Sequence, residues 1–411
     1  MNAPVQDTAR VAPPRTGPWA LFGRYFHRQL DRLGAGIAAG SLEVFTPDGQ
    51  LRLLGGGGPG PAAVVTLNSW RALVRLATGG SAGWYEAWER GEWSSPDPVQ
   101  LFALFSHNRA GLAAQARSRG LSLLPRRLMH WLRRNHRGGS RKNIAFHYDL
   151  GNDFYARWLD PGMSYSSAIF RDADETLEEA QDTKLQAILD RTATKPGETI
   201  LEIGCGWGSF AELALRHGRK LHGITLSTEQ KAWAEARTAG MEGARFSLTD
   251  YRDVTGQYDA VASIEMAEAV GREYWPAYVS AIAQALKPGG RAALQVITFD
   301  DAMFEGYARN VDFIQTYVFP GGMLLKESEF RALADAEGLE WHDRHAFGLD
   351  YAETLRRWRE RFDAAAAAGL LPLQFDARFV RLWRYYLMYC EGGFRGGGID
   401  VIQMTLVKKG G

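Results

Sequence analysis

The sequence has few of the features that would tie it to a disulfide scaffold, a membrane or a nucleic acid. Its two cysteines, Cys205 and Cys390, are too few for a disulfide framework or a zinc site, so we expect a reducing, cytoplasmic compartment. There is no run of about 18 apolar residues and no apolar signal segment near the start, so neither a membrane span nor a secretory signal is predicted. The formal net charge of +1 argues against a nucleic-acid partner.

What the sequence does contain is typical of a globular protein with a substantial core, since 45% of its residues are hydrophobic. Composition and patterning divide it into four parts. We expect a loose tail at residues 1–18, a small α+β accessory domain at 19–115, a basic linker helix at 116–144, and a larger domain at 145–411 that carries the motifs.

Two basic, amphipathic stretches leave a choice open. Residues 19–34 predict a helix that faces either the domain core or a lipid surface. Residues 117–142 contain Arg and Lys but no Asp or Glu, interleaved with Leu, Met and Trp. Such a segment is either a solvated connector or a contact for an anionic membrane surface, worth roughly 1 kcal/mol per cation near it.

Residues 199–208 are the central motif, because they predict a buried strand that runs into a glycine-rich turn and then a helix. Gly204, Gly206 and Gly208 allow a sharp turn and a close approach of the backbone to a ligand. Further strands ending in polar residues are expected at 221–225, 244–248, 258–264 and 291–297, and an edge strand at 399–407. The predicted fold class is α/β, a doubly wound, mostly parallel sheet with a smaller N-terminal α+β domain.

The spacing of this motif resembles that of class I S-adenosylmethionine-dependent methyltransferases rather than dinucleotide dehydrogenases. The third glycine comes too early for a Gly-x-Gly-x-x-Gly fingerprint, and the second strand ends in Thr225 instead of an acid. Ser227 and Gln230 also fit a helix capping box, which is a purely structural alternative for Gln230. The resemblance implies these cofactor-binding residues: Tyr165 and Ser166 over the methionine end, Glu202, Gly204, Gly206 and Gly208 in the strand and loop, Thr225, Leu226 and Gln230 at the ribose, and Asp250 and Tyr251 at the adenine.

A more specific resemblance covers residues 145–409. The matching motifs are residues 146–155, 158–160, 163–167, 319–322 and 383–394, which are similar to those of the cyclopropane fatty acid synthases and their fatty-acid methyltransferase relatives. The resemblance implies transfer of a methyl group from S-adenosylmethionine to the cis double bond of an unsaturated phospholipid acyl chain. It also implies an enzyme that works peripherally at the inner face of the membrane, with a second copy of the chain in a homodimer as a candidate partner.

The chemistry implied by the resemblance produces a carbocation, which needs a dry site, aromatic faces and a base. Candidate aromatic residues are Tyr165, Phe170, Phe304, Tyr307, Phe313, Tyr317, Phe319 and Tyr351. The family's base is a bound bicarbonate, and its holders correspond here to Ser167, Glu268, Gln295, Tyr351 and the backbone of Ile297. Because Ser and Gln stand where the family has Cys and His, Glu268 itself is the alternative base, with a pKa raised by burial.

Three further choices stay open. Direct loss of a methyl proton closes a cyclopropane, the product we expect, whereas a prior hydride shift gives a methylene branch, whose reduction would require a separate redox partner. Cys390 is kept as a catalytic candidate, although buried packing is the favoured interpretation because the chemistry needs no thiol. The competing functions are a methyltransferase for a soluble small molecule and a lipid-binding protein without turnover.

Overall fold

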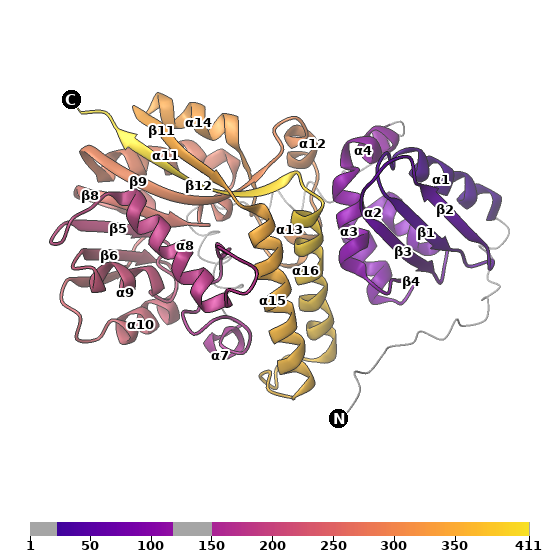
Figure 1. Cartoon of the computed structure of the whole chain (residues 1–411), viewed down its shortest axis with the longest axis horizontal. Coiled ribbons are helices and arrows are strands. Elements are labelled where there is room, and N and C mark those ends of the chain that lie inside the picture. The colour runs from indigo at the N-terminus through magenta and orange to yellow at the C-terminus, as the bar shows by residue number, and fades with distance from the viewer. Residues whose placement is uncertain (1–22, 118–149, 411) are drawn as a thin grey trace. The chain divides into compact units, whose positions relative to one another are not determined.

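The computed structural model describes residues 23–117 and 150–410 (Figure 1). The chain forms two compact units, one within residues 1–121 and the other within residues 122–411. The predicted tail at 1–18, nearly all of the predicted basic linker at 116–144 and the start of the motif at 146–155 lie outside the described residues.

The N-terminal unit is an α+β fold built on a four-stranded sheet in the order β2-β1-β3-β4. β1 (Ser41–Phe45) and β2 (Leu51–Gly55) form the antiparallel hairpin that alternation in the sequence predicts, and β1 pairs in parallel with β3 (Ala62–Leu67). The remaining elements are α1 (Gly23–Ala35), α2 (Arg71–Glu89), β4 (Trp93–Ser94), α3 (Pro98–His107) and α4 (Arg109–Arg117).

α1 faces the core of its own unit, which decides between the two interpretations of this basic helix. Phe26 and Leu30 are buried, and the ring of Phe26 stacks on that of Trp70 with centroids 5.0 Å apart. In α2 the helix is kinked at Gly80, where φ is 56°. Glycine adopts this left-handed conformation without the steric cost that a Cβ would bring.

The C-terminal unit contains an eight-stranded sheet in the order β11-β12-β9-β8-β5-β6-β7, with β10 paired to β9. The strands from β5 to β9 run parallel, which confirms the predicted doubly wound sheet. Their bounds are β5 (Thr199–Ile203), β6 (Lys220–Thr225), β7 (Ala244–Leu248), β8 (Tyr258–Ile264), β9 (Leu286–Phe299), β10 (Leu325–Lys326), β11 (Leu339–Ala346) and β12 (Ile399–Lys408).

The prediction that residues 399–407 form an edge strand is wrong. β12 runs antiparallel between β9 and β11, so β11 is the edge. β12 is buried along most of its length, as an inner strand requires, whereas most of β11 is exposed and rich in charged and polar residues. That polarity hides β11 from a search for alternating apolar residues.

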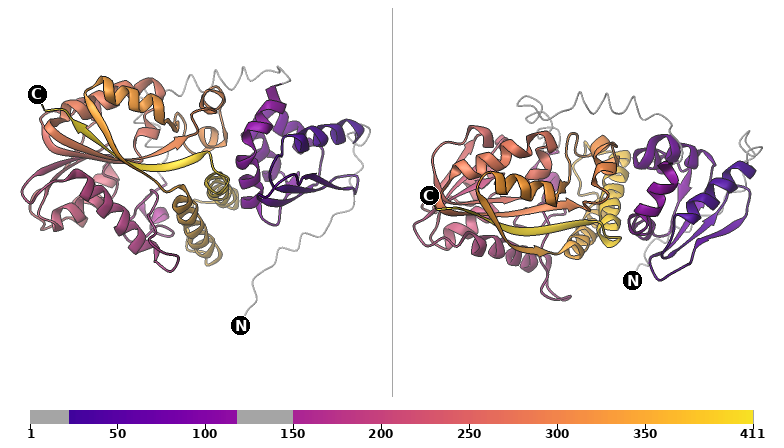
Figure 2. Two further views of the ribbon diagram at one scale, coloured as in Figure 1. Left: turned by 45° about the horizontal axis from the view of Figure 1, so that its top comes forward. Right: turned by 90° about the horizontal axis from the view of Figure 1, so that it is seen from above.

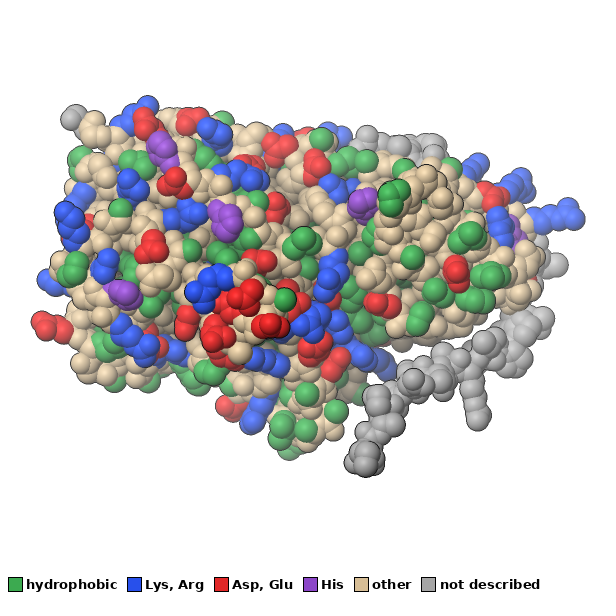
Figure 3. Space-filling view, viewed as in Figure 1, with side chains coloured by type: hydrophobic (Ala, Val, Ile, Leu, Met, Phe, Trp, Pro, Cys, Tyr) green, Lys and Arg blue, Asp and Glu red, His purple; other side chains and the backbone are tan. Residues whose placement is uncertain are grey.

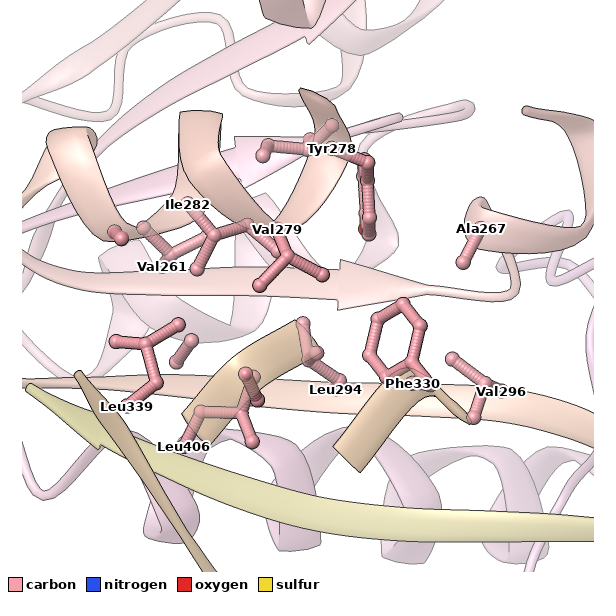
Figure 4. Close-up of a cluster of buried hydrophobic side chains, with 14 of the residues drawn as sticks. Val261, Ala267, Tyr278, Val279, Ile282, Leu294, Val296, Phe330, Leu339 and Leu406 are labelled. Atoms are coloured by element: carbon pink, nitrogen blue, oxygen red, sulfur yellow. The ribbon is translucent and has the colours of Figure 1, made fainter. Parts of the chain in front are cut away.

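Helices cover both faces of this sheet (Figures 1 and 2). On one face, buried side chains of α8 (Leu177–Thr192), α9 (Ser209–Arg216) and α10 (Thr228–Arg237) share a core with β5, β6 and β8. On the other face, Val279 and Ile282 of α11 (Trp275–Ala285) and Phe330 of α14 (Glu327–Ala336) pack on the sheet (Figure 4). The two layers hold the strands rigidly, so the loops at their carboxyl ends start from fixed positions.

The other helices of this unit are α7 (Asn152–Tyr155), α12 (Phe304–Ala308), α13 (Phe313–Tyr317), α15 (Gly348–Ala367) and α16 (Ala377–Arg395). α15 and α16 pack side by side (Figures 1 and 2). Within the described parts of the chain, no helix combines the length and the apolar character needed to cross a bilayer.

Candidate active site

A pocket lies at the carboxyl ends of β5, β6 and β8, the place where doubly wound sheets bind ligands. All of the predicted cofactor residues except Gly208 and Asp250 line it: Tyr165, Ser166, Glu202, Gly204, Gly206, Thr225, Leu226, Gln230 and Tyr251. Residues from four separate segments of the chain therefore meet where the sequence predicts a ligand.

The three glycines of the loop have different physical roles, although all have positive φ. A Cβ on Gly204 would lie 2.6 Å from the Cγ of Met266, and one on Gly208 would lie 2.9 Å from the Cβ of Ala234 in α10. At Gly206, no atom of the described residues would lie within 4 Å of such a Cβ. Gly206 therefore leaves backbone open on the pocket side, whereas Gly208 allows α9 and α10 to approach each other.

Glu202, at the end of β5, presents a buried carboxylate to the pocket. Among the described residues, its Oε2 has no hydrogen-bond partner. Burial raises the pKa of Glu202 well above its usual value, and the charge of Lys184 partly opposes this. A buried carboxylate oxygen without a partner is costly, so this geometry suits a ligand that brings N–H groups or positive charge.

Thr225 and Gln230 are joined to each other at the pocket wall. The hydroxyl of Thr225 donates to the side-chain oxygen of Gln230 at 2.8 Å, and the backbone N–H of Gln230 donates to Ser227 Oγ at 3.2 Å. Ser227 thus caps α10, but the capping box that the sequence suggests is only half formed, because the backbone N–H of Ser227 donates to Thr225 Oγ1 and not to the Gln230 side chain. The Gln230 side chain reaches Thr225 at the pocket wall.

Asp250 and Tyr251 lie differently, although they are neighbours in sequence. Asp250 accepts two hydrogen bonds from the Arg252 guanidinium, at 2.8 and 2.6 Å, and caps the short helix η2 (Tyr251–Asp253). Tyr251 lines the pocket, and burial raises the pKa of its phenol to about 12. The role of Asp250 at an adenine stays a prediction, whereas Tyr251 is placed to touch a ligand.

Glu265, which the sequence did not single out, lines the pocket and accepts hydrogen bonds from three other residues. Its Oε1 accepts from the backbone N–H of Ser167 at 2.9 Å and from Gln295 Nε2 at 2.8 Å, and its Oε2 accepts from the Tyr351 hydroxyl at 2.6 Å. Burial raises the pKa of Glu265, while these three hydrogen bonds and Lys184 lower it. Its backbone φ is 49°, a strained value for a residue with a side chain.

The amide of Gln295 is oriented by a chain of hydrogen bonds from the far side. Gln403 Nε2 donates to Gln295 Oε1 at 3.0 Å, and Arg191 Nε donates to Gln403 Oε1 at 3.1 Å. Because arginine can only donate, this chain assigns the oxygen and nitrogen of both amides. The nitrogen of Gln295 therefore faces Glu265.

Glu268 and Ser167, both predicted holders of an anion, use their side chains in other ways. Glu268 Oε1 accepts from the backbone N–H of Ile297, and in the described chain its buried Oε2 has no hydrogen-bond partner. Burial and then the charge of Glu265 raise the pKa of Glu268 to about 8, so it is mostly protonated at neutral pH. The hydroxyl of Ser167 donates to the carbonyl of Ala168 at 2.9 Å, so only the backbone of Ser167 contacts Glu265.

Lys184 of α8 is a second residue that the sequence did not single out. It is 1% exposed, lines the pocket and donates from Nζ to Ser166 Oγ at 2.7 Å. Burial lowers the pKa of Lys184 to about 8, although the charges of Glu265, Asp160 and Glu202 raise it. Its signal in the sequence is its helical spacing of four from both Ala180 and Ile188, which places a lysine on a buried helix face.

The surroundings of Cys390 agree with the packing interpretation, and only two of the predicted aromatic residues line the pocket. Burial, reinforced by Asp312, raises the pKa of the Cys390 thiol, which makes it a weak nucleophile and agrees with a packing role. Tyr165 and Phe319 do line the pocket, with ring centroids 6.4 Å apart. The other candidates lie elsewhere or behind the lining: Phe170 under Arg357, Phe304 in the sheet core under Arg272, Tyr307 stacked on Phe299, Phe313 and Tyr317 against each other, and Tyr351 at Glu265.

No group of three or more His, Cys, Asp or Glu side chains among the described residues is arranged to hold a metal ion.

Comparisons with known proteins agree on the kind of protein that has such a pocket. The family model described as mycolic acid cyclopropane synthetase matches residues 136–404. Tuberculostearic acid methyltransferase UfaA1 of Mycobacterium tuberculosis is 39% identical over 361 residues, which cover 82% of this chain and 81% of that protein. Cyclopropane-fatty-acyl-phospholipid synthase of Escherichia coli is 38% identical over 261 residues, which cover 63% of this chain and 66% of that protein.

Among solved structures, the mycolic acid cyclopropane synthase CmaA1 complexed with SAH and CTAB matches with a TM-score of 0.60 and 31% identity, over 65% of this chain and 98% of that chain. The sheet order and the position of the pocket thus belong to a fold for which a complex with the demethylated product of S-adenosylmethionine is known.

Proposed function

The chain belongs to the mycolic acid cyclopropane synthetase family of S-adenosylmethionine-dependent methyltransferases, and from this premise we propose that it methylates the cis double bond of an unsaturated acyl chain carried by a phospholipid. The observation that carries the proposal is the continuity of the site. One pocket is lined both by the glycine-rich cofactor loop and by the carboxylate-bearing residue Glu265. An alkene carries no acidic proton and is a weak nucleophile, so it needs both an activated methyl group and a sheltered base.

The residues present fit S-adenosylmethionine, which supplies an electrophilic methyl group when it is bound. The unpartnered oxygen of Glu202 would bind the cationic amino-acid end, since within the described chain no other group satisfies it. Gly206 would offer its open backbone, and the joined side chains of Thr225 and Gln230 would receive the ribose.

The aromatic rings at the pocket would stabilise positive charge as it develops on the acyl chain. Tyr165 and Phe319 present ring faces in the lining, and the Tyr165 hydroxyl is engaged by Tyr386 at 2.9 Å, which fixes its ring. A cation within about 6 Å of a ring face gains roughly 0.5–2 kcal/mol, more when water is excluded. These two faces together would favour a cationic transition state over the neutral alkene.

Two products are consistent with this chemistry, and the observations favour the methylene-branched chain over the cyclopropane. The relative that matches over both units of this chain is named as a methyltransferase, whereas the relative named as a cyclopropane synthase matches over 63% of it. Positions 167 and 295 also differ from the residues that the ring-forming resemblance implies. The cyclopropane remains the second candidate, because the matching family model is named for that product.

The proposal of an anionic membrane surface as a partner rests on the sequence of residues 117–142, which lie almost entirely outside the described residues. On the face drawn in Figure 3, basic and acidic side chains are interspersed. Flotation with vesicles of an anionic phospholipid tests this part: co-flotation at low salt that weakens at high salt would support it, and protein that stays at the bottom at both salt concentrations would contradict it.

The proposed reaction is tested by incubating the purified protein with methyl-labelled S-adenosylmethionine and vesicles of a cis-unsaturated phospholipid. Label should enter the fatty acyl fraction, and NMR of the released esters should show vinylidene protons for a methylene branch or strongly shielded ring protons for a cyclopropane. Vesicles of a fully saturated phospholipid are the matched control and should take up no label. Equal labelling of both vesicle types, or labelling of neither, would contradict the proposal.

A further inference from the structure

We propose that Glu265 is the catalytic base of this enzyme, that its carboxylate takes the place where the family resemblance implies a bicarbonate, and that the reaction therefore needs no bicarbonate. This inference rests on the proposed methyl transfer to an alkene. It concerns a residue that motif matching does not single out, and it reverses the expectation that a small anion is borrowed from solution.

The hydrogen-bond donors around Glu265 carry the argument. Ser167 N, Gln295 Nε2 and the Tyr351 hydroxyl all point their hydrogens at its carboxylate, at 2.9, 2.8 and 2.6 Å. These are three of the positions that the resemblance assigns to bicarbonate. A site that offers only donors requires an anionic acceptor, and this chain supplies that acceptor from its own side chain.

A bicarbonate does not fit beside it. The anion would need the same donors, which Glu265 already engages, and it would bring a second negative charge into a buried site. Lys184 is a buried cation in the pocket lining, and the charges of Glu265, Asp160 and Glu202 already raise its pKa against the effect of burial. The residues present therefore accommodate one anionic acceptor, and Glu265 is that group.

The residue at position 295 agrees with this assignment. Gln295 is held by Gln403 and Arg191 so that its nitrogen donates to Glu265. An amide cannot take up a proton, so Gln295 cannot serve as a relay or as the base. A proton removed here has to end on the carboxylate.

Glu265 is a better base than Glu268, although both residues are only partly exposed. Glu265 accepts three hydrogen bonds, which stabilise its ionised form, whereas Glu268 accepts one from a backbone N–H and has an unpartnered oxygen as far as the described residues go. The charges of the two carboxylates oppose each other, so the one that accepts more hydrogen bonds carries the charge and the other keeps its proton. The left-handed backbone of Glu265, with φ of 49°, is the kind of strain that persists at functional sites.

The proton step balances without any further reactant. The π electrons of the double bond form the bond to the incoming methyl carbon, its bond to sulfur breaks, and the neighbouring chain carbon becomes positive. Glu265 then takes a proton from the added methyl group, so that a C–H bond breaks and an O–H bond forms on the carboxyl. The released electron pair closes the ring, or, after a hydride has moved from the methylated carbon to its neighbour, forms the double bond of a methylene branch.

Both routes take the proton from the transferred methyl group, so both need the base beside the methyl end of the cofactor pocket. Glu265 lines that pocket, together with Tyr165 and Ser166, the residues assigned to the methionine end. The position of Glu265 thus fits the proposed function whichever product forms.

The first experiment measures the methylation rate of the wild-type protein on unsaturated phospholipid vesicles in carbon-dioxide-depleted buffer, with and without added bicarbonate. The inference predicts the same rate in both, and a rate that rises several-fold with bicarbonate would overturn it. A protein inactive under both conditions would count against the proposed function itself, so the two failures are distinguishable.

The second experiment uses Glu265→Gln, Glu265→Ala and the surface control Glu235→Gln, whose carboxylate pairs with Lys231 on α10. Both Glu265 variants should lose about 10²–10⁴-fold in kcat, the usual worth of a positioned base, and the control should lose nothing. Added bicarbonate should restore part of the activity of Glu265→Ala only, because that truncation removes as many heavy atoms as bicarbonate contains. Binding of S-adenosylhomocysteine, measured by calorimetry, should stay within about threefold of wild type. Such binding would show that the variants are folded and that their loss of activity is not a loss of cofactor binding.

Rescue by bicarbonate and binding of S-adenosylhomocysteine together distinguish a catalytic base from a residue that only supports the structure. A folded Glu265→Gln variant that binds S-adenosylhomocysteine and keeps wild-type kcat would overturn the assignment. So would a Glu265→Ala variant that binds the ligand, has lost activity and shows no response to bicarbonate or to the smaller carboxylate formate.

Discussion

Two carboxylates in the lining of the same pocket, Glu202 and Glu265, are treated in opposite ways by the protein. Glu202 keeps an oxygen without a partner among the described residues. Glu265 has donors on both of its oxygens. The difference teaches how to distinguish a group that binds a ligand from one that performs a chemical step: the first is left to be satisfied by the ligand, and the second is oriented beforehand by the protein.

The largest effect should separate the two carboxylates in kinetics. Glu265→Gln is expected to lower kcat about 10²–10⁴-fold while leaving the KM for S-adenosylmethionine nearly unchanged, because a positioned base acts only in the transition state. Initial-rate measurements over a range of cofactor concentrations check this. A variant that raised KM and preserved kcat would show that Glu265 is a binding residue and would remove the contrast.

Glu202→Gln is expected to have a smaller effect, and to act on cofactor binding instead of on kcat. Its main consequence should be weaker binding of S-adenosylmethionine, by about 10–100-fold, because a hydrogen bond to a charged group is worth roughly 1.5–3 kcal/mol. Calorimetric titration with S-adenosylhomocysteine measures this directly. If affinity were unchanged, the unpartnered oxygen of Glu202 would have no part in cofactor binding.

The neighbouring Glu268 should make the stability of the folded protein depend on pH. Its pKa rises from the usual 4.5 to about 8 in the folded state, so between these values the folded protein holds a proton that the unfolded chain releases. Stability from this group is therefore full below about pH 4.5 and is lost as the pH rises through about 8. Glu268→Gln cannot titrate, so its stability relative to wild type should improve as the pH is raised.

Denaturant unfolding of both proteins at about pH 5.5 and about pH 8.5 checks this prediction. A difference in unfolding free energy that does not change between the two pH values would mean that Glu268 is already ionised in the folded protein, and the assignment of charge to Glu265 would then fail.

The smallest effects should separate two glycines of the same loop. Gly208→Ala is expected to destabilise the protein by about 1–3 kcal/mol, because the new Cβ would press on Ala234 and the backbone is left-handed. Gly206→Ala meets open space, so it should cost less stability and weaken S-adenosylhomocysteine binding more. Thermal melts and calorimetry of both variants test this, and equal effects in both assays would remove the distinction.

The sequence was sufficient to predict the parallel sheet, the glycine loop and nine of the residues that line the pocket, because these depend on local spacing. The sequence was not sufficient to predict the role of Glu265. The predicted strand 258–264 ends just before this residue, but no motif marks it. The partners Ser167, Tyr351 and Gln295 lie 98, 86 and 30 residues away in the chain, so only the fold brings them together. Motif matching pointed to Glu268 instead, and the two glutamates differ in hydrogen-bond partners that no local pattern encodes.

The same limit explains the misplaced strand. Alternation along residues 399–407 correctly predicts β12, but strand order depends on which neighbours pair with it, and the exposed, polar β11 gives no apolar signal of its own. The family's anion holders were likewise identified by position, whereas the direction of each side chain decides what it binds. Ser167 uses its backbone and not its hydroxyl, which a sequence cannot reveal.

The most direct test of the whole account is to supply S-adenosylmethionine with a fully deuterated methyl group and to count the deuterium in the modified acyl chain by mass spectrometry. The account predicts that the product has lost one deuterium of the transferred group, because Glu265 removes it whether a ring or a methylene branch forms. An acyl product that retains the methyl group with all of its deuterium would contradict the account, since the proton would then have left from elsewhere and no base beside the methyl group would be needed.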